Sequence, residues 1–441
     1  MSVSRDSNSA KVQKGWLPVT SWVLYDVANT IYASFLTYML VPHLTGSAKG
    51  DQLLWWQKAE FLVGTTQTTS MFLSAAMVPV MGALCDRTAQ TRLYLNIFTL
   101  ACIGAMLGWG FVSAVWAILL LLAIGNLGYQ NALSFYTALL PSVASPARIG
   151  TVSGLGVGLG YLGTILTLVV ALALKPFEIS FQWLAIILGT AFLLLAAPCM
   201  IFVREMRVQP EPFQLSMIPE RFSAVKQTVR SIPRRRLLLL FFLGNFFLVD
   251  VLNTAILFFG SFTLQMFKPM GDLKTLVLAG QSLSAETFRL VAGLFFCVLA
   301  MVSGLIAGAL CDRFHPLRVM RFSGWCLLAG LSGGIAFAGH SPLFYLLSMC
   351  GAGGFGMAGI WTSGRLLLFL IVPREKIGEY NGLYGITLKL SVVGAMTFGI
   401  AANWGQQFAL GVQIVPLLFG LALLYGMRVS DAPIDGGASP R

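Results

Sequence analysis

The sequence Gly-Ala-Leu-Cys-Asp-Arg occupies residues 82–87 and returns, with all six residues identical, at residues 308–313. A second pair keeps the same order and an offset of about 225 residues, with Asp-Val-Ala-Asn-Thr at 26–30 and Asp-Val-Leu-Asn-Thr at 250–254. A looser third pair begins at Pro146 and Pro373. Three matches in register indicate that the second half of the chain repeats the first.

The composition around these motifs excludes a soluble protein. Of 441 residues, 57% are hydrophobic and only 10% are charged, whereas a soluble globular domain carries about 25% charged residues. These values argue against a soluble enzyme, a disordered chain and a collagen-like or disulfide-rich module. A protein that crosses a membrane many times remains.

Twelve apolar runs are long enough to cross a bilayer, which takes about 20 residues each. In hydrocarbon every backbone polar group needs an internal partner, so we expect each run to be a helix. The expected spans are 18–42, 58–84, 92–113, 115–140, 149–174, 181–203, 237–266, 287–311, 317–338, 342–371, 377–402 and 406–428.

The repeat and the spans together predict the fold. Six helices separate the two copies, so both copies have the same orientation in the membrane, as in the two halves of major facilitator transporters. The sequence therefore predicts an all-α membrane protein with 12 transmembrane helices in two pseudo-symmetric six-helix halves. The expected parts are an N-terminal tail (1–17), the first bundle (18–203), a central loop (204–236), the second bundle (237–428) and a C-terminal tail (429–441).

The basic residues predict the orientation in the membrane. If the N-terminus lies inside, 21 of the 29 Lys and Arg residues fall in inner segments, 6 in outer segments, and Arg365 and Lys389 within spans. Cytoplasmic loops carry such an excess. We therefore expect both termini, the two tails and the central loop to be cytoplasmic. The short loops favour a bacterial inner membrane.

Four ionisable residues stand out within the spans: Asp26, its repeat partner Asp250, Arg365 and Lys389. Such a group costs about 2.5–3.5 kcal/mol on insertion scales, so each is a candidate functional residue. Polar residues at helical spacing extend these positions into faces. We expect a central solute- and proton-binding cavity lined by the four charges together with Asn29, Thr30, Asn126, Gln130, Asn253, Thr254 and Trp361. In the alternative interpretation, the two acids and two bases only neutralise one another in structural pairs.

The duplicated Gly-x-Leu-x-Asp-Arg motif predicts a cytoplasmic gate. Glycine lets helices approach closely, and the acid can accept hydrogen bonds from a neighbouring helix N-terminus or an arginine. The expected gate residues are Gly82, Asp86, Arg87, Gly308, Asp312 and Arg313.

Other chemistries lack support in the sequence. Residues 158–163 match G-x-G-x-x-G, but they lie in an apolar helix without the strand that a dinucleotide site requires. No Walker A, H-E-x-x-H, G-x-S-x-G or C-x-x-C motif occurs, and the three His residues are far apart. We therefore expect no enzymatic activity, no cofactor and no metal. The basic residues are scattered, so we expect no nucleic-acid partner.

The same residues carry a family resemblance. The chain resembles major facilitator transporters of the vacuole-effluxer type, also called the unknown major facilitator family. The resembling stretches are Tyr25–Asn29, Leu140-Pro141, Ser153-Gly154, Gly160–Gly163, Asp250–Thr254, Arg365 and Gly382–Gly385. This resemblance implies efflux of an amino acid or a similar small polar solute.

The predicted function is secondary active transport of that solute by alternating access, with Asp26 as a candidate proton carrier. The expected partners are the solute and the lipid bilayer, and the expected state is a monomer. Two alternatives stay open. One is a sugar or organic-anion transporter of the same fold. The other is a membrane receptor or assembly factor that does not transport.

Overall fold

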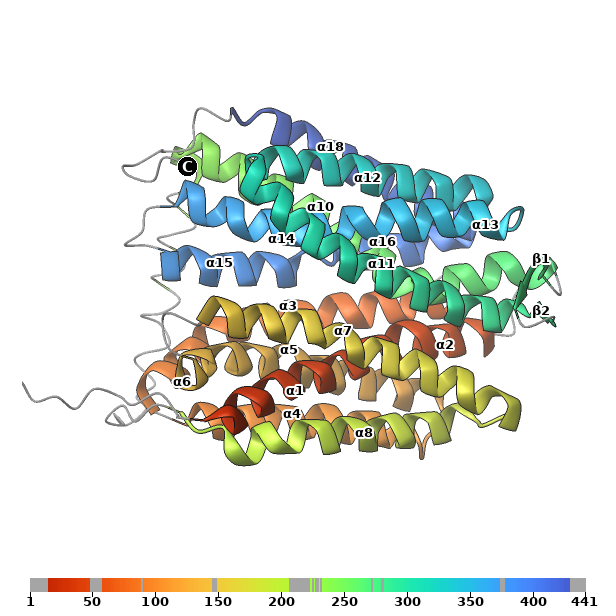
Figure 1. Cartoon of the computed structure of the whole chain (residues 1–441), viewed down its shortest axis with the longest axis horizontal. Coiled ribbons are helices and arrows are strands. Elements are labelled where there is room, and N and C mark those ends of the chain that lie inside the picture. Colours follow the sequence, from red (N-terminus) through yellow and green to blue (C-terminus); the bar gives the residue numbers. More distant parts are fainter. Residues whose placement is uncertain are drawn as a thin grey trace, which may run out of the picture.

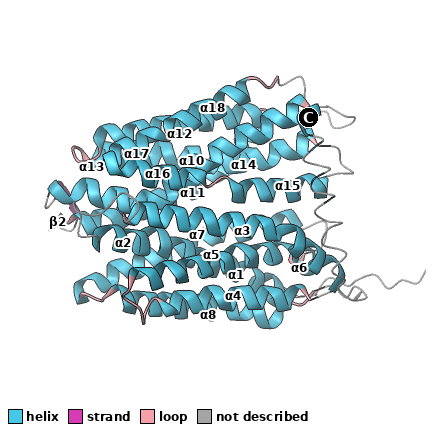
Figure 2. Cartoon of the chain, turned by 180° about the vertical axis from the view of Figure 1, so that it is seen from behind, coloured by secondary structure: helices cyan, strands magenta, loops and turns pink. Residues whose placement is uncertain are grey.

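The chain folds into two groups of long helices that lie side by side with their axes roughly parallel (Figure 1). The computed structural model describes residues 15–47, 58–88, 90–144, 149–205, 223, 226, 230, 232–270, 273–278, 281–372 and 377–428. The first group runs from α1 to α8 and the second from α10 to α18, and a view from the opposite side keeps the same division (Figure 2). The predicted two-half architecture is thereby confirmed.

The first half begins with three elements that run end to end: α1 (Trp16–Phe35), the π-helical turn η1 (Leu36–Leu40) and α2 (Val41–Ser47). Its remaining elements are α3 (Ala59–Thr88), α4 (Thr91–Gly108), α5 (Val115–Ala138), α6 (Leu140–Val143), α7 (Ile149–Leu174), η3 (Lys175–Phe177) and α8 (Phe181–Phe202).

The second half begins with η4 (Ile232–Arg234) and α10 (Arg236–Phe267). The elements that follow are η5 (Lys268–Met270), α11 (Ala285–Arg313), α12 (Pro316–Phe337), α13 (Pro342–Tyr345), the π-helical η6 (Leu346–Ala352), α14 (Gly353–Ile371), α15 (Ile377–Leu390), α16 (Val393–Ala401), η8 (Ala402–Trp404), α17 (Gln406–Val412) and α18 (Ile414–Tyr425).

These helices make the chain an integral membrane protein that crosses the bilayer several times. Within the described residues, ten helical segments are long and apolar enough to span a membrane. The segment from α1 to α2 and helix α3 are long as well, so the structure is consistent with the predicted twelve spans.

A small antiparallel hairpin joins α10 to α11 and was not predicted. Its strands are β1 (Leu273–Leu278) and β2 (Gln281–Leu283). The hairpin lies at the end of the bundle opposite to the one at which α18 ends (Figure 1). We call this end the hairpin end, and the end at which α1 begins and α18 leaves the bundle the terminal end.

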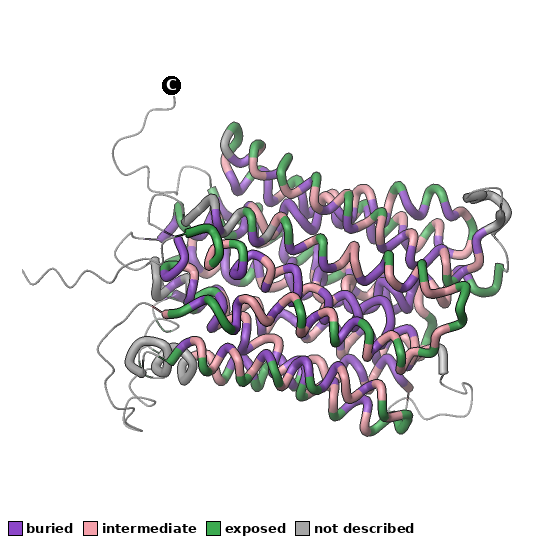
Figure 3. Tube along the Cα trace, turned by 60° about the horizontal axis from the view of Figure 1, so that its bottom comes forward, coloured by how far each residue is buried: buried purple, intermediate pink, exposed green. Residues whose placement is uncertain are grey.

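The outer faces of the helices carry apolar side chains, whereas buried residues gather inside the bundle (Figure 3). Leu120, Leu194 and Leu305 are all more than 60% exposed. In water such a surface would be costly, but next to lipid chains it is the expected one. Trp116 and Trp404 are exposed near the hairpin end, where interfacial tryptophans belong.

The two halves meet along three seams. The first joins α3 to α15 and α16, the second joins α7 to α11, and the third joins η1 and α2 to α10. In the first seam a Cβ at Gly64 would lie 2.8 Å from the carbonyl carbon of Ala395, so the helices touch backbone to backbone. Such contacts between small residues bring membrane helices close together.

Candidate functional site

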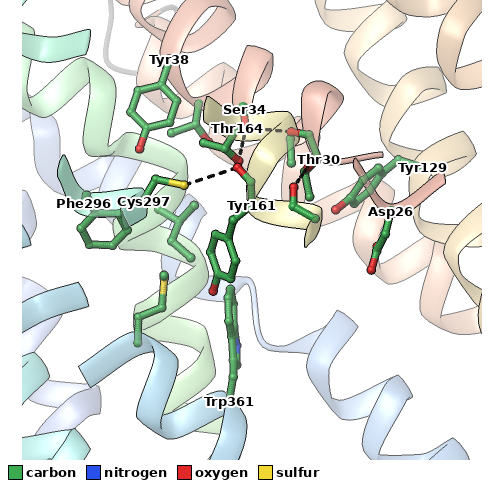
Figure 4. A pocket seen from close by; sticks show the side chains of 15 residues that line it. Asp26, Thr30, Ser34, Tyr38, Tyr129, Tyr161, Thr164, Phe296, Cys297 and Trp361 are labelled. Atoms are coloured by element: carbon green, nitrogen blue, oxygen red, sulfur yellow. Dashed lines mark hydrogen bonds between the residues drawn. The ribbon is translucent and has the colours of Figure 1, made fainter. Parts of the chain in front are cut away.

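A cavity of about 300 Å³ lies between the two halves. The first half contributes side chains from α1, η1, α5 and α7, and the second half from α10, α11 and α14. The lining residues are Asp26, Thr30, Ala33, Ser34, Thr37, Tyr38, Tyr129, Gly160, Tyr161, Thr164, Ile256, Phe296, Cys297, Met357 and Trp361. Figure 4 places Asp26 and Tyr129 at one side of the cavity and Tyr38 and Phe296 at the other.

Asp26 is a carboxylate in this cavity without an ion-pair partner among the described residues. Its neighbour Tyr136 interacts with the carboxylate through its hydroxyl, and a Cβ at Gly156 would lie 3.1 Å from Asp26 Oδ2 and 3.2 Å from Tyr136 Oη. The two groups do not form a hydrogen bond of standard geometry. A carboxylate has two acceptor oxygens, so positions remain at which Asp26 can accept a hydrogen bond from a ligand.

The polar face of α1 is held against α7 beside Asp26. Thr30 Oγ1 donates a hydrogen bond of 2.5 Å to the Gly160 carbonyl, and Ser34 Oγ donates one of 2.7 Å to Thr164 Oγ1. A Cβ at Gly163 would overlap the Val27 carbonyl oxygen, so only glycine allows this approach. The contacts fix the side of the cavity that Asp26 occupies.

The second half supplies a cation and an aromatic ring. Trp361 of α14 lines the cavity next to Tyr161 (Figure 4). Arg365, one turn further along α14, is exposed and acts electrostatically on Asp26. It forms no hydrogen bond or ion pair within the described part of the chain. A negative group of a ligand could therefore reach its guanidinium.

Asp250 has a different environment from its repeat partner Asp26. The helix against which it packs is interrupted at Ser391-Val392, and α16 begins anew at Val393. Asp250 Oδ1 accepts a hydrogen bond of 2.8 Å from the Gly394 N–H. The buried carboxylate thus caps the positive N-terminus of α16. Asn253 supports the same break, since its Nδ2 donates a hydrogen bond of 2.6 Å to the Ser391 carbonyl.

This cap predicts a difference between two substitutions. Asp250→Ala removes the acceptor and should lower the free energy of unfolding by about 1–2 kcal/mol. Asp250→Asn keeps an oxygen acceptor and should retain most of the stability, because Asn caps helices about as well as Asp. Thermal unfolding of the purified full chain in detergent measures both. Equal losses for Ala and Asn would contradict a capping role.

Lys389 ends α15 just before the break and connects the two halves. Its Nζ donates hydrogen bonds to Ser74 Oγ (2.9 Å), the Gln130 carbonyl (2.8 Å) and Ser134 Oγ (3.4 Å), all in the first half. The residue is 9% exposed. All three acceptors are neutral, so this ammonium is buried without a countercharge among the described residues.

Polar contacts also close the two halves against each other at the hairpin end. Glu60 of α3 accepts hydrogen bonds from Gln265 Nε2 (3.0 Å) and Gln406 Nε2 (2.9 Å), both in the second half. Ser261 of α10 pairs with Thr45 at 2.7 Å. Lys175 at the end of α7 donates to Ser284 and Thr287, where α11 begins.

The structure brings only some of the predicted cavity residues together. Asp26, Thr30 and Trp361 line the cavity. Asn126 instead donates to Ser70 of α3 at 2.7 Å, and Thr254 donates to the Asp250 carbonyl at 2.8 Å. Asn29 is buried, and its Oδ1 has no partner. The four intramembrane charges form no ion pairs with one another.

The predicted gate motifs form the last turns of α3 and α11 rather than loops. The side chains of Gly82, Asp86, Arg87 and Asp312 lie outside the described residues. In the second copy, a Cβ at Gly308 would meet nothing within 4 Å. Arg313 is exposed, and its guanidinium carbon lies 5.7 Å from the centre of the Phe314 ring.

Several cavity residues were missed because they carry no charge. Tyr129, Tyr161 and Phe296 look like ordinary members of apolar helices in the sequence. Tyr38 and Cys297 gave no signal either. Ser34 and Thr37 are the cavity residues that their spacing could have identified, since they lie about two and three turns beyond Asp26 on the same polar face.

Comparison with known proteins identifies the family. The sequence model for the family described as vacuole effluxer Atg22 like matches residues 55–432. The chain belongs to this family. A relative from Bacillus subtilis (strain 168), described as the uncharacterized MFS-type transporter YxiO, is 25% identical over 419 residues, which cover 92% of each chain.

Solved structures share the fold of this vacuole-effluxer family member. A bacterial homologue of the human lysosomal transporter Spinster, in an inward-facing and unoccupied conformation, has a TM-score of 0.69 at 13% identity, covering 96% of this chain and 100% of the other. The peptide transporter POT in complex with sulfate has a TM-score of 0.68 at 14% identity, covering 95% and 96%. The fold is therefore that of the major facilitator superfamily.

Proposed function

We propose that the chain is a secondary active transporter that moves a small polar solute, an amino acid or a metabolite of similar chemistry, by alternating access. The observation that carries this proposal is the Asp26 carboxylate, which has no ion-pair partner among the described residues, in a cavity between two pseudo-symmetric halves. The cavity volume of about 300 Å³ is at the lower end of ligand pockets, which suits a small solute.

The charges around the cavity favour a zwitterion. Asp26 would accept hydrogen bonds from the ammonium group, and Arg365 would bind the carboxylate. Neither forms an ion pair among the described residues, and Tyr136 is the neighbour of the Asp26 carboxylate. Tyr161 and Trp361 would contact the apolar part of the solute. Bidentate binding of a carboxylate is the interaction for which a guanidinium is best shaped. Lys389, the other candidate for this role, is occupied by contacts within the protein.

The hydrogen bonds between the halves suggest which side of the cavity is closed. Glu60, Lys175 and Thr45 all contribute contacts near the hairpin end. We propose that the cavity opens toward the terminal end in this state. With the termini in the cytoplasm, as the basic residues predict, this state faces inward. The Spinster homologue of the same fold was solved in an inward-facing conformation.

Transport would then follow from rocking of the first bundle (18–203) against the second (237–428), with the central loop 204–236 as the connection. The contacts at the hairpin end would break as the terminal end closes. Asp26 would bind a proton or the ammonium group of the solute on one side of the membrane and release it on the other. A monomer in a bacterial inner membrane suffices for this cycle.

A two-stage screen tests the proposal. Thermal unfolding of the purified chain is first measured with amino acids, sugars and organic acids at two pH values, and solutes that stabilise it are then tested for counterflow in proteoliposomes. We expect amino acids to raise the unfolding temperature and to exchange. Exchange of sugars or organic anions alone would overturn the substrate class. Stabilisation without any exchange would favour a receptor.

A further inference from the structure

Arg289 of α11 is a buried guanidinium that the fold leaves without a partner. The residue is 9% exposed, and neither Nε nor Nη1 has a hydrogen-bond partner. It forms no ion pair within the described part of the chain. Glu286, one turn earlier, acts on it electrostatically but is itself exposed. Burial of an arginine in this way is expensive unless another group binds it.

A second arginine shows how this fold treats a guanidinium with a structural role. Arg321 of α12 donates to the Leu424 carbonyl at 2.8 Å and to the Met427 carbonyl at 2.6 Å. Its guanidinium also lies 4.7 Å from the centre of the Tyr425 ring. Arg289 has none of these contacts. The comparison shows that the described part of the chain supplies no such hydrogen bonds to Arg289 Nε and Nη1.

Arg289 lies on the face of α11 that leads to the cavity. Gly293, four residues further, packs so closely on the Tyr38 ring that a Cβ there would overlap it. Phe296 and Cys297, the next turn, line the cavity. Tyr38 lines the cavity as well and also interacts electrostatically with Arg289. Tyr38 thus lines the cavity on the side away from Asp26 (Figure 4) and is the cavity residue that interacts with Arg289.

The backbone at Tyr38 is irregular. Tyr38 belongs to the π-helical turn η1 (Leu36–Leu40), which interrupts the first membrane helix between α1 and α2. Single π-helical turns are rare and often occur at functional sites. Lys175, which interacts electrostatically with Arg289, donates to Ser284 and Thr287 and so helps to close the hairpin end.

We propose that Arg289 is a second solute subsite, which binds a carboxylate on the path between the cavity and the hairpin end when the Tyr38 ring moves aside. This inference rests on the proposed transport of a carboxylate-bearing solute. A guanidinium binds a carboxylate through two parallel charge-assisted hydrogen bonds, and a site shielded from water strengthens them. Arg289 would bind the solute when the hairpin end is open, and Arg365 would bind it when the terminal end is open.

Direction-resolved transport in proteoliposomes tests the subsite. The full chain, its Arg289→Gln variant and the control Arg318→Gln, which changes an exposed arginine at the terminal end, are compared with the amino acid that the wild type transports best. We expect Arg289→Gln to raise the KM for solute added at the hairpin end by about tenfold or more, as for the loss of one charged contact. The KM from the terminal end should change little, as should both KM values of the control. Equal effects from both ends, or none, would overturn the subsite.

A binding measurement separates this inference from the transport proposal. Thermal unfolding of the detergent-solubilised chain is followed in sodium acetate and in sodium chloride at equal ionic strength. If Arg289 binds carboxylates, acetate should raise the unfolding temperature of the wild type and of Arg318→Gln, but raise that of Arg289→Gln by less. An identical acetate effect in all three proteins would overturn the subsite even if transport is found. A selective loss in Arg289→Gln would support it even if no amino acid is transported.

Discussion

Asp26→Asn should reduce amino-acid transport by at least about tenfold, because the loss of a charged contact in a buried site costs about 2 kcal/mol or more. The substitution keeps the size of the side chain and removes the charge that would bind the solute ammonium. It breaks no ion pair among the described residues, and the amide oxygen can still accept from the Tyr136 hydroxyl. Since a charge in a span costs about 2.5–3.5 kcal/mol on insertion scales, the unfolding temperature should stay the same or rise.

The matched control for this variant is Glu178→Gln. Glu178 is an exposed carboxylate in the turn after α7, so its conversion to an amide should leave transport and stability unchanged. Initial rates in proteoliposomes and thermal unfolding of the same preparations measure both properties. A folded Asp26→Asn variant with the wild-type rate would contradict the role of Asp26.

Lys389→Met should have the second large effect. Methionine fills similar space but cannot donate to Ser74, Gln130 and Ser134. The three hydrogen bonds by which Lys389 connects the halves are therefore lost. We expect the transport rate to fall by about tenfold or more, as for other buried charged contacts. The three acceptors are neutral, so the substitution leaves no acidic side chain among the described residues without its ion-pair partner. The unfolding temperature should therefore stay the same or rise.

Two further variants test whether transport requires the hydrogen bonds that Lys389 makes between the halves. Lys268→Met changes an exposed lysine at the hairpin end and should not alter the rate. Ser74→Ala removes only one of the three acceptors and should slow transport less than Lys389→Met does. A Lys389→Met protein that transports at the wild-type rate would show that the lysine plays no part in the cycle.

The fold could be predicted from the sequence because its constraints are local and strong. Each span must satisfy its own backbone in lipid, so its length and composition identify it as a helix. The duplicated motifs at 82–87 and 308–313 then give the relation between the halves. The hairpin at Leu273–Leu278 and Gln281–Leu283 escaped prediction, because it lies in a loop where no such constraint acts.

The candidate site could be predicted only in part. The spacing of polar residues correctly indicated that Asp26, Thr30 and Trp361 share a space, and they line one cavity. The repeat made Asp26 and Asp250 look equivalent. Their difference depends on the break at Ser391-Val392, which places a helix N-terminus beside Asp250 and not beside Asp26. No proline or glycine occupies these two positions, so the break could not be predicted from them.

The partners of the intramembrane bases could not be predicted for a similar reason. Lys389 bonds to a backbone carbonyl and two hydroxyl groups across the seam. Such contacts depend on how two halves dock, which the pattern of each helix does not encode. Arg289 was placed among the outer segments by its position in the sequence, and its burial appears only in the folded chain.

The reactivity of one native thiol tests the central claim, that the space between the halves is an aqueous chamber open to one side at a time. Cys297 lines the cavity as a free cysteine, and a full chain in which it is the only remaining cysteine is reconstituted into vesicles of known orientation. A membrane-impermeant methanethiosulfonate reagent is added at either end, with and without the transported amino acid. The account predicts modification from the terminal end, much slower modification from the hairpin end, and protection by the solute. A thiol that stays unreactive from both ends until the protein is denatured would contradict it.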